Sequence, residues 1–266
     1  MKDLVTWFGL KRHPFDKGIK SSQAVDTGPL RECAARLDYI KRRGGIMLLT
    51  GDPGVGKTIA LRRFADGLGE TRYRTVYTPL STLRGGDLLR HLNQLLGLPY
   101  GASKSILFSQ IQHDLLESHE QKGRTVALII DEAQLLQVPA LHELRLLTNF
   151  RMDSYDPFIL IIAGQSDLRR VMEYAVMEPF AQRLAMRYHM PPLTPDESAA
   201  YLRHHLQLAG TKEAIFTDDA LRALHENSYG IPRRLGALAE QAMNYAMFAE
   251  KRSLDADMVI KAQAGQ

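Results

Sequence analysis

The sequence has a single cysteine, Cys33, among 266 residues. A disulfide within one chain is therefore excluded, and one thiol cannot hold a metal by itself. No apolar run reaches the roughly 18 residues that a membrane helix needs. The first fifteen residues, MKDLVTWFGLKRHPF, lack the apolar stretch and the small-residue cleavage site of a secretory signal. We therefore expect a reduced, cytoplasmic setting and no membrane partner.

Internal repeats, low-complexity tracts and a strong charge of one sign are absent as well. The net charge is only +4, from 34 Lys and Arg against 30 Asp and Glu. The basic excess lies at the beginning, where residues 1–45 hold ten Lys or Arg and five Asp or Glu. A basic segment of this kind can contact nucleic-acid phosphates, although a solvated surface is an equally good interpretation.

Strand and helix patterns alternate through the middle of the chain. Residues 125–134 and 157–165 contain continuous runs of Val, Ile and Leu, which are typical of parallel strands buried on both faces. Further strands are expected at 45–50, 75–80 and 187–190, and helices at 57–67, 85–97, 104–121 and 139–150. The alternation predicts a three-layer α/β domain with a parallel five-stranded sheet.

The pattern changes after Pro191 and Pro192. Thr194 and Glu197 form a capping-box signature, with Pro195 at the first helical position. The helical patterns that follow contain no strand, so we expect a small all-α domain. The predicted division is an N-terminal basic segment at 1–44, an α/β domain at 45–192 and a helical domain at 193–266.

The segment GDPGVGKT at 51–58 fits the pattern G-x-x-x-x-G-K-[ST], and it lies between a predicted strand and a predicted helix. Glycines allow backbone N–H groups to surround phosphate oxygens, Lys57 reaches the β- and γ-phosphates, and Thr58 offers a hydroxyl to Mg²⁺. The helix that follows directs its positive end at the anion. The predicted nucleotide contacts here are Gly51, Pro53, Gly54, Val55, Gly56, Lys57, Thr58 and Ile59.

Polar residues follow two of the buried strands. Asp131 ends the strand near 126–130, where it can hold Mg²⁺ together with Thr58, and Glu132 can orient the attacking water. Gln165 ends the strand near 158–164 and can bond the γ-phosphate or the water, because ligands of parallel sheets lie at the carboxyl ends of strands. The alternatives are a solvated acid at Glu132 and an ordinary strand-end amide at Gln165.

Four arginines outside these motifs stand at informative positions. Arg233 and Arg234 lie in the first turn of a predicted helix, where a basic side chain opposes the helix dipole unless an anion is near. Arg183 and Arg187 lie in EPFAQRLAMRYHMPPL, residues 178–193. Two exposed structural arginines are the alternative interpretation for each pair.

Together the phosphate loop, DEAQ, AGQ, QRL and GIPRRL, with the opening WFGLKRHPF, resemble AAA+ ATPases of the ExeA-like group. This group contains general secretion ATPases and transposition regulators of the TniB/TnsC/MuB type. The resemblance covers nearly the whole chain. It implies ATP hydrolysis with Mg²⁺ in a ring or helical filament. The secretion members are usually longer, with a membrane span and a further module, so the length favours the transposition regulators.

The resemblance also implies roles for individual residues. Gln165 would be sensor 1, and Arg233 would be sensor 2 from a helical lid. The adenine would lie near Pro14 and Phe15. An arginine of the neighbouring subunit would complete each site, and we expect Arg183 to be this finger, with Arg187 as the second candidate. Met186, Tyr188 and Met190 alternate on one face of a short strand, which leaves Arg187 on the other face, whereas Arg183 can project from the domain edge.

Two functions are carried forward from the sequence. The first is an ATP-dependent regulator that oligomerises on double-stranded DNA without sequence preference and recruits or activates a transposase. Its weakly supported DNA contacts are Arg84, Lys11 and Arg12, with Lys17 nearby. The alternative is an assembly or motor ATPase that acts on a protein partner in secretion. A replication-initiator type is a third, less favoured reading.

Overall fold

The computed structural model describes residues 3–16, 18–79, 85–211 and 213–265. Contacts between Cα atoms divide the chain into two compact units. We call them the α/β unit, residues 32–51 and 57–190, and the helical unit, residues 1–31, 52–56 and 191–266. Unlike the predicted division, the contacts assign the N-terminal 31 residues and the loop 52–56 to the helical unit; the domain boundaries themselves stay a prediction.

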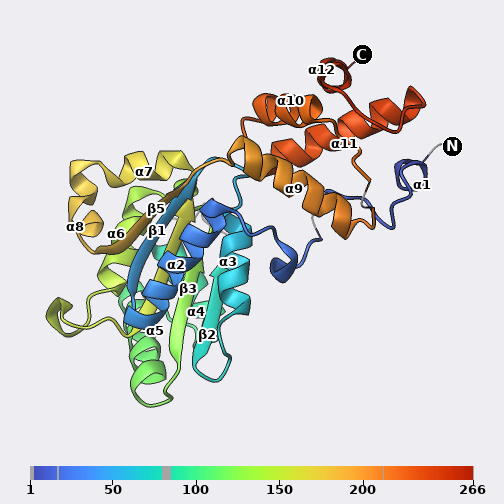
Figure 1. Ribbon diagram of the computed structural model, residues 1–266. Coiled ribbons are helices and arrows are strands. Elements are labelled where there is room, and N and C mark those ends of the chain that lie inside the picture. The colour runs from blue at the N-terminus through green and yellow to red at the C-terminus, as the bar shows by residue number, and fades with distance from the viewer. Residues whose placement is uncertain (1–2, 17, 80–84, 212, 266) are drawn as a thin grey trace. The chain divides into compact units, whose positions relative to one another are not determined.

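A five-stranded parallel sheet forms the centre of the α/β unit (Figure 1), as the sequence predicted. Its strand order is β2-β3-β4-β1-β5. The strands are β1 (Gly45–Gly51), β2 (Tyr73–Thr78), β3 (Thr125–Ile130), β4 (Phe158–Gly164) and β5 (Leu184–Met190). The last strand begins three residues earlier than expected and forms one edge of the sheet.

The central strands are apolar throughout because both of their faces are covered. Consecutive residues of β1, such as Leu48 and Leu49, face opposite sides, and both are almost fully buried. The parallel register pairs Thr50 of β1 with Gly164 of β4. It also pairs Thr78 of β2 with Ile130 of β3. The carboxyl ends of these strands therefore lie on the same side of the sheet. The polar residues of the motifs come directly after these strand ends.

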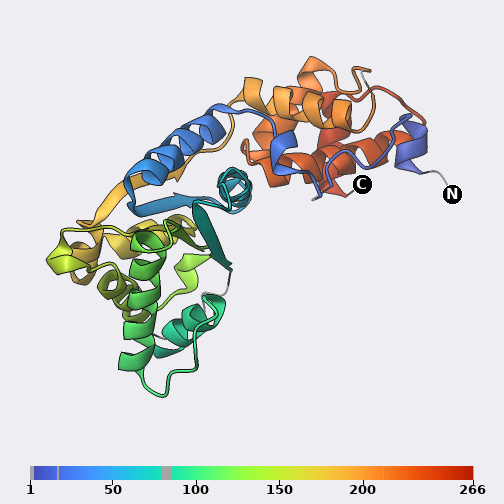
Figure 2. The ribbon, with the colours of Figure 1, turned by 90° about the horizontal axis from the view of Figure 1, so that it is seen from below.

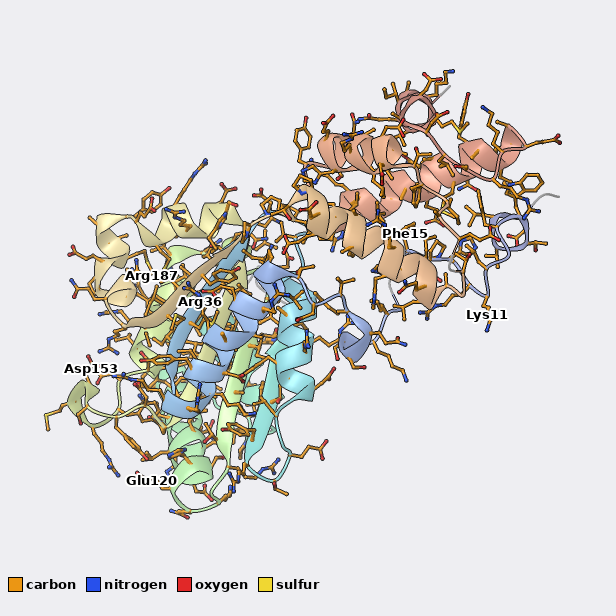
Figure 3. All side chains as sticks on the ribbon, viewed as in Figure 1. Lys11, Phe15, Arg36, Glu120, Asp153 and Arg187 are labelled. Carbon is orange, nitrogen blue, oxygen red and sulfur yellow. The ribbon has the colours of Figure 1, made fainter. Side chains whose placement is uncertain are left out.

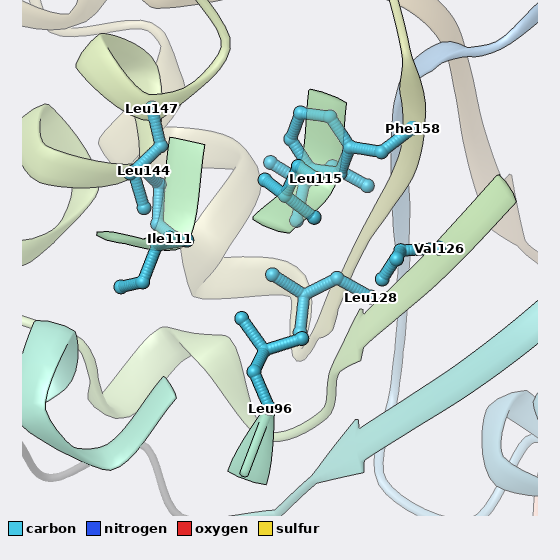
Figure 4. Close-up of a pocket in the computed structure, with 9 residues that line it drawn as sticks. Leu96, Ile111, Leu115, Val126, Leu128, Leu144, Leu147 and Phe158 are labelled. Carbon is cyan, nitrogen blue, oxygen red and sulfur yellow. The ribbon is translucent and has the colours of Figure 1, made fainter. Parts of the chain in front are cut away.

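Helices cover the two faces of the sheet. Figure 2 shows α2 and α3 on one face and α4 and α5 on the other. The helices of this unit are α2 (Gly28–Arg43), α3 (Lys57–Asp66), α4 (Gly85–Leu95), α5 (Lys104–Glu120), α6 (Val138–Leu147), α7 (Ser166–Met172) and α8 (Glu178–Ala181), with the short 3-10 turns η2 (Ala133–Leu135), η3 (Arg151–Asp153) and η4 (Ala175–Met177). The core under α4, α5 and α6 is built from leucine and isoleucine. A cavity of about 10 Å³ within it (Figure 4) is barely large enough for one water, so this is packing and not a ligand site.

The helical unit packs around a second apolar core. Its elements are α1 (Leu4–Trp7), η1 (Ser21–Gln23), α9 (Pro195–Leu208), α10 (Asp218–Ser228), α11 (Pro232–Phe248) and α12 (Ala256–Ala264). The capping box predicted at α9 is present. The Glu197 backbone N–H donates to Thr194 Oγ1 at 3.3 Å, and the Thr194 N–H donates to Glu197 Oε2 at 3.0 Å.

The N-terminal segment is bound to α9 and α11 within the helical unit. The Lys11 backbone N–H donates to Ala209 O at 2.7 Å. Phe15 stacks on His205 with ring centroids 5.6 Å apart, and its ring also lies against Gly236 of α11. Figure 3 marks Lys11 and Phe15 on this segment. These first residues are therefore an integral layer of the helical unit.

Three helices of the α/β unit, α2, α7 and the four-residue α8, were not among the helices predicted from the sequence. Helix α2 lies in the segment described as basic, and its apolar face buries Cys33, Leu37 and Ile40. Its three consecutive C-terminal basic residues lie in the last helical turn, where they favour the helix dipole. Helix α7 has only seven residues and follows Gln165 directly. Within the described residues, no helix combines the length and apolar character needed to cross a bilayer.

Candidate nucleotide site

The phosphate loop, residues 52–56, connects the end of β1 to the start of α3. Gly54 and Gly56 have φ values of 90° and 115°, which a residue with a side chain rarely adopts. Helix α3 begins at Lys57. The Lys57 side chain is buried, and its Nζ donates to Gly51 O at 2.8 Å. An ammonium group kept in this buried position, at the start of a helix, favours an anionic ligand.

Thr58 and Asp131 converge from α3 and the end of β3. Thr58 Oγ1 donates to Asp131 Oδ2 at 3.1 Å. Asp131 is almost completely buried, and the parallel pairing of β2 with β3 carries the Tyr77 hydroxyl to the same carboxylate at 3.3 Å. Burial, followed by the charge of Asp131, raises the pKa of Tyr77 to about 12. Tyr77 therefore stays protonated and remains a donor at physiological pH.

Glu132 follows Asp131 with a φ of 52°, in the left-handed region. Its backbone N–H donates to Asp131 Oδ1 at 2.9 Å. Its carboxylate Oε2 accepts from Gln134 Nε2 at 2.7 Å, and Gln165 Nε2 lies 3.5 Å from the same oxygen. The structure therefore brings together the carboxylates and the amide that the sequence predicted at the ends of β3 and β4.

The residues present fit a magnesium nucleotide. A hydroxyl and a buried carboxylate 3.1 Å apart are hard oxygen donors of the kind that Mg²⁺ prefers. Gly56 provides backbone without a side chain next to Lys57, as a phosphate cradle requires. Lys57 and the loop would hold the phosphates, and Thr58 with Asp131 would hold the ion. Bound Mg²⁺ supplies positive charge that neutralises phosphoryl oxygens.

Within the helical unit, the phosphate loop contacts the start of α11. The Arg233 backbone N–H donates to Gly54 O at 3.3 Å. A Cβ on Gly54 would lie 2.7 Å from Arg233 Cβ and 3.2 Å from Ile231 Cγ2, so any larger residue would push this helix away. The Arg233 side chain is exposed. Glycine at position 54 is therefore required both by its positive φ and by this close approach.

Arg183 does not project from the domain edge, contrary to the expectation from the sequence. Its guanidinium bonds Thr148 Oγ1 at 3.0 Å and Arg145 O at 3.3 Å, and it pairs with Asp153 at 2.9 Å. Only 20% of the Arg183 side chain is exposed. The physical reason is the loop at Asp153, marked in Figure 3, which places a carboxylate beside the guanidinium.

Arg187 lies on β5 and is exposed, as the strand pattern predicted. Its Nη2 donates to Ala181 O at 2.5 Å. On the opposite face of the strand, Arg36 of α2 lies over the Tyr188 ring at 4.8 Å; Figure 3 marks Arg36 and Arg187. Which of Arg183 and Arg187 serves a neighbouring subunit stays a prediction.

The other predicted contacts lie in the helical unit or outside the described residues. Phe15 is half-buried on His205, and Pro14 O accepts from His205 Nδ1 at 2.9 Å. Lys11 and Arg12 are exposed. Arg84 and Lys17 lie outside the described residues.

Two residues of the site were missed from the sequence. Tyr77 could have been found because it lies next to the last position of a strand that runs parallel to β3. Gln134 gave a weaker signal, since only its place in DEAQ, two residues after Glu132, pointed to the site. Its role depends on how the chain turns after β3.

Comparison with known proteins identifies the family of this chain. The model of an AAA domain family matches residues 40–172, half of the chain. The chain is 35% identical over 241 residues to General secretion pathway protein A of Aeromonas hydrophila, and the match covers 89% of this chain. It spans only 44% of the length of that relative.

Solved structures show the same fold. The Holliday junction branch migration motor RuvB of Thermotoga maritima superimposes with a TM-score of 0.59 at 18% identity, covering 96% of this chain and 73% of RuvB. The ORC1 protein of Aeropyrum pernix, solved in complex with DNA, gives a TM-score of 0.62 at 18% identity, covering 89% of this chain and 64% of ORC1. The chain belongs to the AAA domain family and is, as a member of it, a P-loop ATP hydrolase that uses ATP with Mg²⁺.

Proposed function

We propose that this protein is an ATP-dependent regulator that oligomerises on double-stranded DNA and recruits or activates a transposase. Hydrolysis of ATP would control how long the assembly persists. The observation that carries the proposal is the site at the ends of β3 and β4, where Glu132 stands beside Asp131 and is bonded by Gln134. A carboxylate in this place supports a switch that hydrolyses its nucleotide rather than a passive scaffold.

DNA as the partner rests on separate support. The excess of basic residues in 1–45 and the exposure of Lys11 and Arg12 are suited to phosphate contacts without sequence readout. ORC1, which has the same fold, was solved with DNA. Self-assembly into a ring or filament belongs to the same proposal, since an arginine of one subunit would complete the site of the next.

The second candidate is an assembly or motor ATPase for a protein partner of a secretion system. The 35% identity to General secretion pathway protein A favours it. It predicts that a protein partner, and not DNA, stimulates hydrolysis. The cytoplasmic setting is shared by both candidates and stays a prediction.

A gel shift separates the two candidates. Wild type and Glu132→Gln are titrated onto two unrelated DNA duplexes with ATP, a non-hydrolysable ATP analogue, ADP or no nucleotide. We expect binding to both duplexes with ATP or the analogue, weaker binding with ADP, and the most persistent complex for Glu132→Gln with ATP. Because contacts would be mainly to phosphates, the affinity should fall about 100-fold or more between 50 and 200 mM salt.

Lys57→Ala is the matched control, because it removes the phosphate contact and leaves the exposed basic residues of the helical unit in place. It should bind DNA equally with and without ATP. Absence of DNA binding by the wild type in every nucleotide state would contradict the proposed function and favour the protein-directed alternative.

A further inference from the structure

The turn after β3 carries a second polar residue whose side chain faces Glu132. Gln134 lies in η2, within the short segment between Asp131 and α6, and is half-buried. Its Nε2 donates to Glu132 Oε2 at 2.7 Å. Its Oε1 accepts from the Gln165 backbone N–H at 3.0 Å. One amide therefore connects the carboxylate after β3 to the first residue after β4.

The two partners determine how this amide is oriented. An ionised carboxylate only accepts hydrogen bonds, and a backbone N–H only donates them. Gln134 must therefore present its nitrogen to Glu132 and its oxygen to Gln165, with no freedom to flip. Glutamate at position 134 would lack the donor, and lysine would lack the acceptor. The bridge requires one donor and one acceptor in the same side chain, and an amide provides both.

The backbone brings η2 close enough to β4 for this bridge. A Cβ at Gly164 would lie 3.1 Å from the Gln134 backbone nitrogen, which is tighter than an ordinary contact. Glycine at position 164 therefore lets the turn lie close against the end of β4. Glu132 contributes with its left-handed φ of 52°, and its backbone N–H is bonded by Asp131. A non-glycine residue in this conformation is uncommon and needs such support.

We propose that Gln134 is a positioning residue, which couples the end of β4 to the carboxylate of Glu132. Gln165 contributes from the same place, since its own side-chain amide lies 3.5 Å from Glu132 Oε2. A shift of the β4 end would move the Gln165 N–H, and through Gln134 it would turn the Glu132 carboxylate. This inference rests on the proposed role of Glu132 in orienting the attacking water.

Replacing Gln134 by Glu would break the bridge at the Glu132 end. The change removes the donor and adds a negative charge about one hydrogen bond from the Glu132 carboxylate. Like charges repel, so the Glu132 side chain must leave the position in which the amide holds it.

The test compares Gln134→Ala, Gln134→Glu and Gln137→Glu by steady-state ATP hydrolysis, with kcat and KM measured separately. We expect Gln134→Ala to lower kcat by about 10- to 100-fold with little change in KM, because a reacting group is misplaced while the phosphate loop is intact. Gln134→Glu should lower kcat further, again with little change in KM, because its charge repels the Glu132 carboxylate. Gln137→Glu adds the same charge at an exposed position three residues on and should match the wild type.

Two controls keep the outcomes distinct. Thermal unfolding of each variant checks that the fold is retained, since a merely structural role would lower stability without lowering the kcat of the folded protein at an unchanged KM. Glu132→Gln tests the underlying assignment: if it hydrolyses ATP normally, the proposed role of Glu132 fails. If Glu132→Gln is inactive while Gln134→Glu has the kcat and KM of Gln137→Glu, only the role of Gln134 is overturned.

Discussion

At the scale of single residues, the site is a set of hydrogen bonds in which several donors converge on one carboxylate. Asp131 is the central acceptor, bonded by Thr58, Tyr77 and the Glu132 N–H. These donors hold the buried carboxylate in one place, where its oxygens can serve as ligands of a cation. The Thr58 hydroxyl can turn from donor toward Asp131 to ligand of Mg²⁺, because a hydroxyl has both capacities.

Thr58 provides a test of this arrangement. Thr58→Ala removes the hydroxyl, so the Mg²⁺ concentration for half-maximal ATP hydrolysis should rise about tenfold, equivalent to the loss of one interaction with a charged group. Thr58→Ser retains the hydroxyl and should remain within about twofold of the wild type. Equal Mg²⁺ dependence of the two variants would mean that this hydroxyl is not a ligand.

At the scale of elements, packing of the N-terminal segment on α9 depends on a neutral histidine. Burial lowers the pKa of His205 below its ordinary value of 6.5, although its bond to Pro14 O opposes this shift. A carbonyl only accepts, so Nδ1 carries the proton of the neutral ring. The unfolded chain takes up a proton near pH 6.5 and the folded chain only at lower pH, so stability must decline as the pH falls below 6.5.

This loss of stability at low pH gives a prediction for the helical unit. Between pH 7.5 and 5.5, the melting temperature of the wild type should fall by a few degrees more than that of His205→Gln, whose amide can still donate to Pro14 O but does not titrate. Differential scanning calorimetry of both proteins across this range measures the difference. If the melting temperatures of the two proteins fall in parallel with pH, protonation of His205 does not lower the stability of the protein.

The elements also show how far the sequence could lead. Asp131 and Gln165 were predictable because apolar strands in a parallel sheet end at one edge, so the residues after them must be neighbours. Gln134 and the partners of Arg183 were not predictable, because they depend on backbone in the left-handed region. Glu132 has such a φ, and so do three consecutive residues in the loop beside Arg183, namely Arg151, Met152 and Asp153.

The structure of the N-terminal region was also not predicted from the sequence. Its basic residues were interpreted only by their charge, as a segment for nucleic-acid phosphates or as a solvated surface, whereas residues 28–43 form a helix whose apolar face is buried. Local charge says little about whether a segment is helical, since the buried residues of α2 recur at helical spacing between the charged ones. The fold class was nevertheless predictable, because long Val, Ile and Leu runs leave few alternatives to a covered parallel sheet.

At the scale of the whole molecule, a nucleotide site completed by a neighbouring subunit's arginine requires more than one copy of the chain. Arg183 is held by Asp153 within its own subunit, so its proposed action on a neighbour requires this ion pair to be exchanged for the neighbour's phosphates. Such exchange is reasonable energetically, because the pair is partly exposed and surface ion pairs contribute about 1 kcal/mol or less. Arg187 is exposed and is the matched alternative.

Mixing two inactive variants tests whether the nucleotide site is shared between neighbouring subunits. Glu132→Gln should lower hydrolysis by about 100- to 10,000-fold while keeping its arginines. Arg183→Ala should lower it by about 1,000-fold or more while keeping its own nucleotide site. The measurement is the ATP hydrolysis rate of the equimolar mixture, with Arg187→Ala replacing Arg183→Ala in a parallel experiment.

We expect the mixture with Arg183→Ala to recover up to about a quarter of the wild-type rate, since one interface in four joins an intact site to an intact arginine in a head-to-tail assembly. Recovery only with Arg187→Ala, itself inactive alone, would transfer the role to Arg187. If neither mixture exceeds its separate components although mixed oligomers form, the claim of a nucleotide site shared between subunits is contradicted.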